Sequence, residues 1–307
     1  MQEQSLTRPP LIRPTDWIRR FVGWLREALT PLIRREPVSR ELLVTDVAAL
    51  QAARAEAERR YAFRLEGRRI GCLLVHGLTS TPQSMRAVGE YLAEHGIDVE
   101  AVLLPGHGTT PEDLESTSWE DWYEAVRAGL DRLRPRCDRL FVCGQSMGGA
   151  LAMRAAALEP VDGLITLAGF VYLRDWRVKL LPVLRRVMRW RRSIGNDIAD
   201  PEAYDEVCYA RMSLQTVEDL IALGRDVQPL LPDIEVPALI IQSRVDHVVP
   251  PDTADYIYDH IASRDKELVR LEHSYHVISM DYERDLVAER CVRFMRHVAY
   301  AEPRRRA

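Results

Sequence analysis

The chain of 307 residues lacks several features that by themselves identify a class of protein. No stretch reaches the roughly 18 uninterrupted apolar residues of a membrane-spanning helix, and the N-terminus has no short apolar run of the signal-peptide kind. The main body has no basic patch interleaved with stacking aromatic residues, so we expect no nucleic-acid partner. With no internal repeat and no low-complexity linker, the chain is expected to form one large domain, or a domain with an appendage.

Cysteine is scarce and shows no pattern. The five cysteines are odd in number and have neither C-x-x-C spacing nor a metal-ligand arrangement with histidine. We interpret them as small buried side chains in a reducing compartment, and we expect a cytoplasmic protein that needs no metal or organic cofactor. The sequence does not determine the oligomeric state.

Charge is distributed unevenly along the chain. Residues 1–40 contain eight arginines against four acidic side chains, a net +4 within a chain whose total is −4. Over residues 14–35 we expect a helix with apolar side chains on one face and arginines beside it: Trp17, Phe21, Trp24, Leu25, Leu29, Arg19, Arg20 and Arg26. Such a basic amphipathic segment predicts docking on an anionic membrane surface or on a partner. The alternative is a helix that packs on its own domain.

Beyond residue 66 the pattern changes to apolar strands that alternate with amphipathic helices. Strands are predicted at 70–75, 99–104, 140–143, 163–168, 237–242 and 267–271. This alternation predicts an α/β fold, with a mostly parallel sheet covered by helices on both faces. The carboxyl ends of parallel strands gather their loops at one edge, where we expect the reactive groups.

We therefore divide the chain into an N-terminal helical extension (1–66), a core (67–169 and 215–307) and an insertion (170–214). The insertion is predicted to contain a basic amphipathic helix over residues 172–190 and a short helix from Pro201 to Tyr209. Because it follows a central strand, it is expected to lie over the carboxyl ends of the sheet as a cap or lid. The alternative is a helical insertion away from the site.

A Gly-x-Ser-x-Gly motif at residues 144–148 organises the rest of the chain. An apolar run before it predicts a strand, and an alanine-rich run after it predicts a helix. Small residues on both sides of Ser146 allow a sharp, strained turn that lifts the serine oxygen to the carboxyl end of the sheet. The motif predicts a nucleophile, and the alternative is a turn with only a structural role.

A serine hydroxyl is a weak nucleophile at neutral pH, so it needs a base that is itself oriented by a carboxylate. Asp246 follows the strand predicted at 237–242, and His276 follows the strand predicted at 267–271. The order Ser146, Asp246, His276 is the one expected for an elbow-type hydrolase. Two other histidines compete for the base. His247 is too near Asp246 to be its partner across loops, whereas His273 comes directly off the strand end and stays open.

Three further groups around the motif have expected roles. His107 also follows a predicted strand, and we interpret it as a structural loop histidine. A developing oxyanion needs N–H donors, and the backbone N–H of Met147 supplies one at the start of a helix. We expect the second from the backbone N–H of Leu78, because Gly77 allows the first strand–helix loop to approach closely.

These motifs together resemble one known group of enzymes. The matching segments are residues 72–85, 105–108, 144–149, 246–251 and 274–277. They are similar to the bacterial monoacylglycerol lipase and small carboxylesterase branch of the α/β-hydrolases. The resemblance runs from about Gly71 to Val298 and includes Ser193, Ile194 and Gly195 in the cap.

The resemblance implies a Ser146–Asp246–His276 triad, which favours His276 over His273, and an oxyanion hole formed by Leu78 and Met147. It also implies that Glu206 binds a glycerol-like head group and that Ile194 lines the entrance.

The expected function is that of a serine carboxylic ester hydrolase that forms an acyl-enzyme. Its substrate would be a small lipid or ester, most simply a monoacylglycerol or a short- to medium-chain ester. An apolar cap with few acidic residues near the site also favours an acyl chain over a charged substrate. Two alternatives stay open: an acyltransferase with the same triad, and a non-catalytic membrane or partner adaptor on a hydrolase scaffold.

Overall fold

The computed structural model describes residues 47–67, 69–174 and 181–300, and the rest of the chain lies outside it. The described strands are β1 (Phe63–Leu65), β2 (Ile70–Val75), β3 (Asp98–Val102), β4 (Arg139–Gln145), β5 (Gly163–Leu167), β6 (Trp190–Arg192), β7 (Arg211–Ser213), β8 (Ala238–Ser243) and β9 (Lys266–Leu271). The described α-helices are α2 (Val47–Tyr61), α3 (Arg86–Glu94), α4 (Pro111–Glu115), α5 (Trp119–Leu133), α6 (Met147–Leu158), α7 (Leu181–Leu184), α8 (Leu214–Val227), α9 (Thr253–His260) and α10 (Arg284–Tyr300). Short 3-10 turns cover Pro82–Met85, Arg134–Arg136 and Gln228–Asp233.

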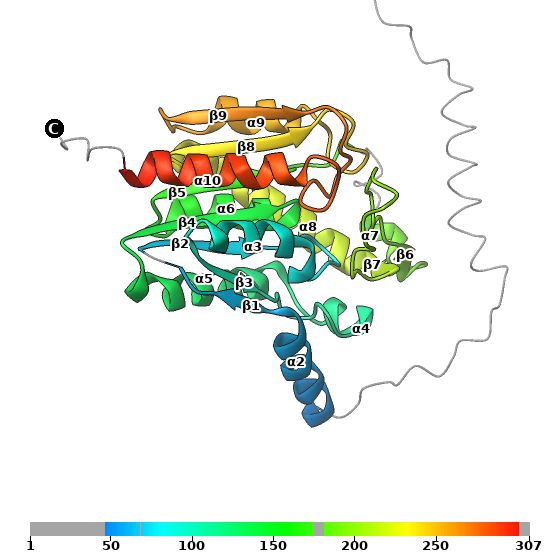
Figure 1. The fold of residues 1–307 in the computed structure, drawn as a ribbon. Helices are drawn as coiled ribbons and strands as arrows, with labels where there is room; N and C mark the ends of the chain where they lie inside the picture. The colour runs from blue at the N-terminus through cyan, green and yellow to red at the C-terminus, as the bar shows by residue number, and fades with distance from the viewer. Residues whose placement is uncertain (1–46, 68, 175–180, 301–307) are drawn as a thin grey trace, which may run out of the picture. The chain divides into compact units, whose positions relative to one another are not determined.

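A seven-stranded sheet with the order β1-β3-β2-β4-β5-β8-β9 forms the centre of the molecule (Figure 1). Its neighbouring strands pair in parallel except β1, which is antiparallel to β3 at the edge. Because helices cover both faces, the inner strands are buried throughout, and β2 reads as the apolar run Ile-Gly-Cys-Leu-Leu-Val. The predicted fold class is confirmed.

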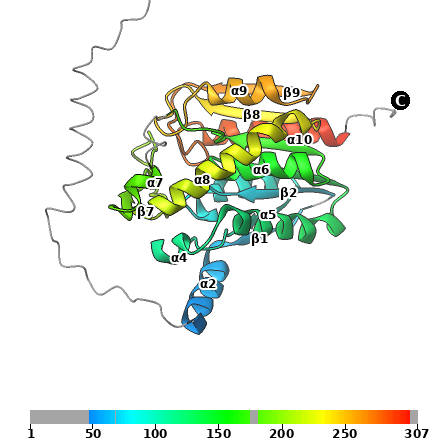
Figure 2. The same ribbon diagram turned by 180° about the vertical axis from the view of Figure 1, so that it is seen from behind.

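Two apolar layers lie against the two faces of the sheet. Figures 1 and 2 show α3 and α10 on one face, and α5, α6, α8 and α9 on the other. The first layer includes Leu74, Val88 and Val292, and the second includes Leu73 and Trp122. Alternate residues of β2 therefore enter opposite layers, as the period of a strand requires.

The cap contains less helix than the sequence predicts. Within the described part of residues 172–190, helix is confined to α7, and the two helices expected there and at 201–209 are not formed as predicted. Instead β6 pairs antiparallel with β7, and the ring of Trp190 lies 4.8 Å from the guanidinium carbons of both Arg189 and Arg211. Strand pairing and cation–π contacts stabilise an extended backbone that begins at Trp190, the last residue of the first predicted helix.

The cap is anchored to loops of the core through Tyr209. Its hydroxyl accepts a hydrogen bond from the N–H of Thr109 at 2.8 Å and donates to the carbonyl of Gly106 at 2.8 Å. Its backbone N–H donates to the carbonyl of Thr79 at 3.0 Å. Thr79 follows the carboxyl end of β2, so the cap lies at the edge of the sheet where the reactive groups are expected.

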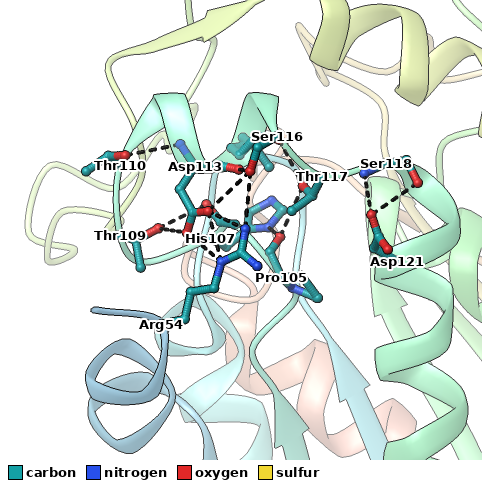
Figure 3. Close-up of polar contacts among 12 residues, drawn as sticks. Arg54, Pro105, His107, Thr109, Thr110, Asp113, Ser116, Thr117, Ser118 and Asp121 are labelled. Carbon is teal, nitrogen blue, oxygen red and sulfur yellow. Dashed lines mark hydrogen bonds and ion pairs between the residues drawn. The ribbon is translucent and has the colours of Figure 1, made fainter. Parts of the chain in front are cut away.

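Helix α2 packs on the short helix α4 and the residues just before it. Nε of Arg54 lies 2.9 and 3.1 Å from the two carboxylate oxygens of Asp113, whose side chain is fully buried (Figure 3). The hydroxyl of Thr109 donates to the same carboxylate at 2.7 Å. The last part of the predicted extension, α2 and β1, thus belongs to the same compact unit as the rest of the sheet.

The helix expected over residues 14–35 lies outside the described residues. Among the residues that the structure does describe, no helix is both long enough and apolar enough to cross a bilayer.

Candidate active site

Ser146 lies in a strained turn between β4 and α6. Its φ of +54° and ψ of −117° are in a region that residues with a side chain rarely adopt. Its N–H donates to the carbonyl of Leu167 at 2.9 Å, and its carbonyl accepts from the N–H of Phe170 at 3.0 Å. Any side chain at Gly148 would overlap the carbonyl oxygen of Val75. The neighbouring strands therefore hold the turn, and the motif's glycine lets α6 start against β2.

A buried aspartate and histidine meet at the ends of β8 and β9. Nδ1 of His276 lies 2.8 Å from Oδ2 of Asp246, and their side chains are 8% and 0% exposed. Gln242 donates to the same oxygen through Nε2 at 2.8 Å. The other oxygen accepts from the N–H groups of Val248 and Val249, at 2.8 Å each. The carboxylate thus accepts four hydrogen bonds, one of them from the imidazole.

Electrostatics at this pair favour the charged carboxylate and a basic imidazole. Burial alone would raise the pKa of Asp246. The charge and hydrogen bond of His276 lower it, and so do the hydrogen bonds from two backbone N–H groups. These effects together exceed that of burial, so the pKa of Asp246 lies below its usual value. Burial lowers the pKa of His276, but the charge and hydrogen bond of Asp246 hold it above its usual value, with Glu206 and Asp197 adding to the effect.

The competing histidines have other partners. The backbone N–H of His273 donates to Glu283 at 3.0 Å, and its ring does not pair with Asp246. Nδ1 of His247 lies 2.9 Å from Oδ1 of Asp197 in the cap. Of the histidines that follow β8 and β9, the structure brings His276 to the carboxylate that the sequence singled out.

Two contacts bring the neighbouring loops to the serine. The hydroxyl of Ser279, three residues after His276, hydrogen-bonds the side-chain oxygen of Gln145, the residue before Ser146. On the other side, a Cβ added to Gly77 would lie 3.5 Å from Cβ of Ser146. The loop carrying His276 (residues 272–283, the His276 loop) and the loop after β2 therefore both lie next to the turn.

The loop after β2 is held from behind by a buried histidine. Nε2 of His76 accepts the N–H of Leu104 at 3.1 Å, so Nδ1 carries the proton and donates to the carbonyl of Gly77 at 2.8 Å. Burial, followed by the nearby His107, holds the pKa of His76 well below its usual value. The bond to Gly77 fixes the peptide group whose N–H belongs to Leu78. Met147 is the first residue of α6, where a helix leaves its N–H groups unpaired.

His107 is buried against its neighbours, as expected for a structural loop histidine. Its Nδ1 lies 3.1 Å from the carbonyl of Pro105, and its ring packs edge-on against His76 and Trp122. Burial lowers its pKa to about 4, so the ring is neutral at physiological pH.

The two cap residues singled out by resemblance lie in adjacent turns. Oε2 of Glu206 accepts the N–H of Asn196 at 2.9 Å, and its charge contributes to the raised pKa of His276. Ile194 is 51% exposed. Burial, then the charge of Glu206, raises the pKa of Cys208 to about 12. Glu206 is thus part of the structure of the cap as well as a charge that faces the imidazole.

No three His, Cys, Asp or Glu side chains within residues 47–67, 69–174 and 181–300 are grouped to hold a metal ion. All five cysteines are free thiols.

Sequence reasoning missed several residues that support the pair. Gln242 donates to Asp246, and Asp197 accepts the N–H of His276. Asp281 accepts the N–H of Tyr275 within the His276 loop. Asp197 lies 79 positions before His276 in the chain, so no local pattern could connect them. The one available signal was the position of Gln242 at the end of a predicted strand, four residues before Asp246.

A strained serine after the central strand of such a sheet, with a histidine–carboxylate pair on later strand ends, is the arrangement of an α/β-hydrolase. The family described as "Serine aminopeptidase, S33" matches residues 68–283. A thermostable monoacylglycerol lipase of Bacillus sp. (strain H-257) is 38% identical over 240 residues, covering 76% of this chain and 92% of the lipase. A carboxylesterase of Bacillus subtilis (strain 168) is 30% identical over 236 residues, covering 76% of this chain and 95% of the esterase.

Solved structures agree with these relatives. One from work on LipS and LipT, two metagenome-derived lipolytic enzymes, has a TM-score of 0.74 and 38% identity, and the match covers 77% of this chain and 97% of the other. The Paleococcus ferrophilus monoacylglycerol lipase, at 18% identity and a TM-score of 0.66, shares the fold over 78% of this chain and 99% of its own. The chain therefore belongs to this family of α/β-hydrolases, in the branch of monoacylglycerol lipases and small carboxylesterases.

Proposed function

We propose that this protein is a serine esterase that hydrolyses carboxylic esters through an acyl-enzyme on Ser146. The observation that carries the proposal is the buried hydrogen bond between His276 and Asp246, 2.8 Å long, on a loop that contacts the residue next to Ser146. A neutral imidazole with Nδ1–H held by a carboxylate presents Nε2 as a base, which is the form that a serine nucleophile needs.

The reaction follows from these roles. Oγ of Ser146 attacks the ester carbonyl while Nε2 of His276 takes its proton, and the oxyanion accepts hydrogen bonds from the N–H groups of Leu78 and Met147. Nε2 then gives the proton to the leaving alcohol as the C–O bond breaks. Water attacks the acyl-enzyme with His276 again as base, which releases the acid and restores the serine.

The proposed substrates are monoacylglycerols and short- to medium-chain esters. The side chain of Leu78 packs against an apolar cluster of the cap and the first turn of α8 formed by Leu181, Met212, Leu214 and Val217. An acyl chain bound beside the oxyanion donors would therefore meet apolar groups. Glu206, whose charge acts on His276, is proposed to accept hydrogen bonds from a glycerol-like head group, with Ile194 at the entrance.

We also propose that the protein is cytoplasmic and attaches to anionic membranes through residues 14–35. The support is the sequence pattern of tryptophan and phenylalanine on one helix face with arginines beside it. Deleting residues 1–40 is expected to abolish co-sedimentation with anionic liposomes while ester hydrolysis in solution is retained. Equal binding by the full chain and the deletion variant would contradict membrane docking.

The catalytic proposal is tested by labelling and by turnover. A fluorophosphonate probe is expected to modify Ser146, and Ser146→Ala is expected to lower turnover by roughly 10³-fold or more, since the covalent route is lost. Failure of the wild-type protein to react with the probe would favour a non-catalytic role. Product analysis with an added acceptor alcohol separates hydrolysis from acyl transfer.

The substrate proposal has its own test. A panel of monoglycerides and matched methyl esters of increasing chain length gives the acyl preference. Glu206→Ala is expected to raise KM for monoglycerides but not for a simple aryl ester, because only the glyceride has a head group to bind. Equal effects on both substrates would assign Glu206 a structural role in the cap.

A further inference from the structure

Asp197, a carboxylate of the cap, contacts two loops of the site. One is the His276 loop, which carries the proposed base, and the other is the loop after β8, which carries Asp246. Oδ2 of Asp197 accepts the backbone N–H of His276 at 3.2 Å, and its backbone carbonyl accepts the N–H of Val277 at 3.1 Å. Oδ1 lies 2.9 Å from Nδ1 of His247, the residue after Asp246. The Asp197 side chain is 15% exposed, so water competes little for these contacts.

The His276 loop makes the reciprocal contact through a second carboxylate. Asp281 is fully buried, and it accepts the backbone N–H groups of Ala199 at 2.8 Å and Asp200 at 2.9 Å from the cap. It also accepts the N–H of Tyr275, the residue before His276, at 2.7 Å. Cap residues 197–200 and the His276 loop are therefore joined by hydrogen bonds from both sides, and a movement of one displaces the other.

We propose that Asp197 is a positioning residue, which holds the backbone of His276 so that the imidazole directs Nε2 toward Ser146. This inference rests on the proposed function of the site. Two rotatable bonds separate the histidine backbone from its ring. Asp246 fixes the ring at Nδ1 and Asp197 fixes the backbone at the N–H, so the direction of Nε2 is determined from both ends.

The same residue acts on the imidazole through its charge. Three carboxylates are near enough to stabilise the imidazolium: Asp246 from the loop after β8, and Glu206 and Asp197 from the cap. Removing the charge of Asp197 moves the acid limb of the pH–rate profile to lower pH, since the base then loses its proton more easily. A residue that only stabilised the fold would not move this limb.

Two variants separate the hydrogen bond to His276 from the charge. Asp197→Ala removes both, whereas Asp197→Asn removes the charge and keeps an oxygen for the N–H of His276, with its NH₂ group facing Nδ1 of His247, which can accept as a neutral ring. Glu202→Ala is the matched control, because Glu202 is an exposed acidic residue of the same cap segment. For each protein we would measure kcat and KM for an aryl ester across pH, the rate of fluorophosphonate labelling of Ser146, and the midpoint of thermal unfolding.

We expect Asp197→Ala to lower kcat and the labelling rate by roughly 10- to 100-fold with little change in KM, as misplacement of a reacting group by about 1 Å does. Asp197→Asn should recover most of the kcat, and both variants should shift the acid limb to lower pH. The control should match the wild type in every measurement.

Three results would overturn the inference. The first is an Asp197→Ala variant whose kcat and labelling rate equal those of the wild type. The second is a loss of kcat that is equal in the alanine and asparagine variants. If the alanine variant does not fold, an unchanged acid limb in Asp197→Asn is the third. A wild-type protein that neither reacts with the probe nor hydrolyses any ester overturns the proposed function itself, which distinguishes the two failures.

Discussion

The tautomer of His276 depends on how Asp246 distributes its hydrogen bonds, and Asp246→Asn tests that dependence. Oδ1 accepts from the backbone N–H groups of Val248 and Val249 at 2.8 Å each, and neither donor can turn away. Oδ2 accepts from Nε2 of Gln242 and Nδ1 of His276 at 2.8 Å each. Since an asparagine amide has one oxygen and one NH₂ group, the NH₂ group must replace one of these two oxygens.

We expect the NH₂ group at the Oδ2 position, because both partners there can adapt. Gln242 can flip its amide, which brings Oε1 toward the new donor. Among the described residues this oxygen is buried and has no hydrogen-bond partner, so the flip gives it one, at the loss of the long 3.5 Å hydrogen bond from Nε2 to the carbonyl of Ser243. His276 can move its proton from Nδ1 to Nε2 and accept from the NH₂ group. Nε2 then carries a hydrogen and cannot take the proton of Ser146.

The variant should therefore be stable but nearly inactive. The wrong tautomer is expected to lower kcat by roughly 10³- to 10⁴-fold. Because the hydrogen bonds re-form, the free energy of unfolding should fall by only about 1–2 kcal/mol, which lowers Tm by roughly 2–4 °C in a protein of this size. Aryl ester hydrolysis and thermal unfolding measure the two effects, with Ser146→Ala as the baseline for activity. A folded Asp246→Asn protein that keeps more than about a tenth of the wild-type kcat would refute the tautomer argument.

Two further predictions concern charge. Because the pKa of His276 is raised above its usual value, kcat/KM should fall as pH decreases through that raised value. Glu206→Gln removes one of the charges that raise this pKa, so it should move the acid limb of the pH–rate profile to lower pH. A profile unchanged by the substitution would contradict this electrostatic role of Glu206. Arg54→Ala leaves the buried carboxylate of Asp113 without its cation and should lower the free energy of unfolding by about 2 kcal/mol. Arg59→Ala is the control, because both side chains of its ion pair are exposed, and it should change the free energy of unfolding little. Equal thermal shifts in the two arginine variants would show that burial of the partner does not matter here.

Much of the core could be predicted because its signals are local. Strand β2 has the predicted bounds, since an apolar run between turns is read from adjacent residues. The sharp turn at Ser146 follows from its flanking small residues, and its φ of +54° is the consequence.

Helix boundaries and the cap were less accessible to the same reasoning. The sequence predicts a helix over residues 216–227 that Thr216 would cap, whereas Ser213, three residues earlier, caps α8 by accepting the N–H of Thr216. Within the helix expected across residues 172–190 the described residues form only α7, and from Trp190 on the chain is β6, which pairs with a strand about 20 positions further along the chain. The spacing of apolar residues does not show whether a distant strand will pair with a segment and hold its backbone extended rather than helical.

The sequence by itself determined the order of the strands predicted in the core, the position of the candidate nucleophilic serine and the set of candidate acids and bases, because each depends on residues close together in the chain. Only the tertiary structure decided which histidine meets Asp246, that Asp197 of the cap contacts the His276 loop, and that Arg54 of α2 pairs with Asp113. These pairings join residues 30, 79 and 59 positions apart. They depend on the path of the backbone between the partners, and no local pattern of side chains records that path.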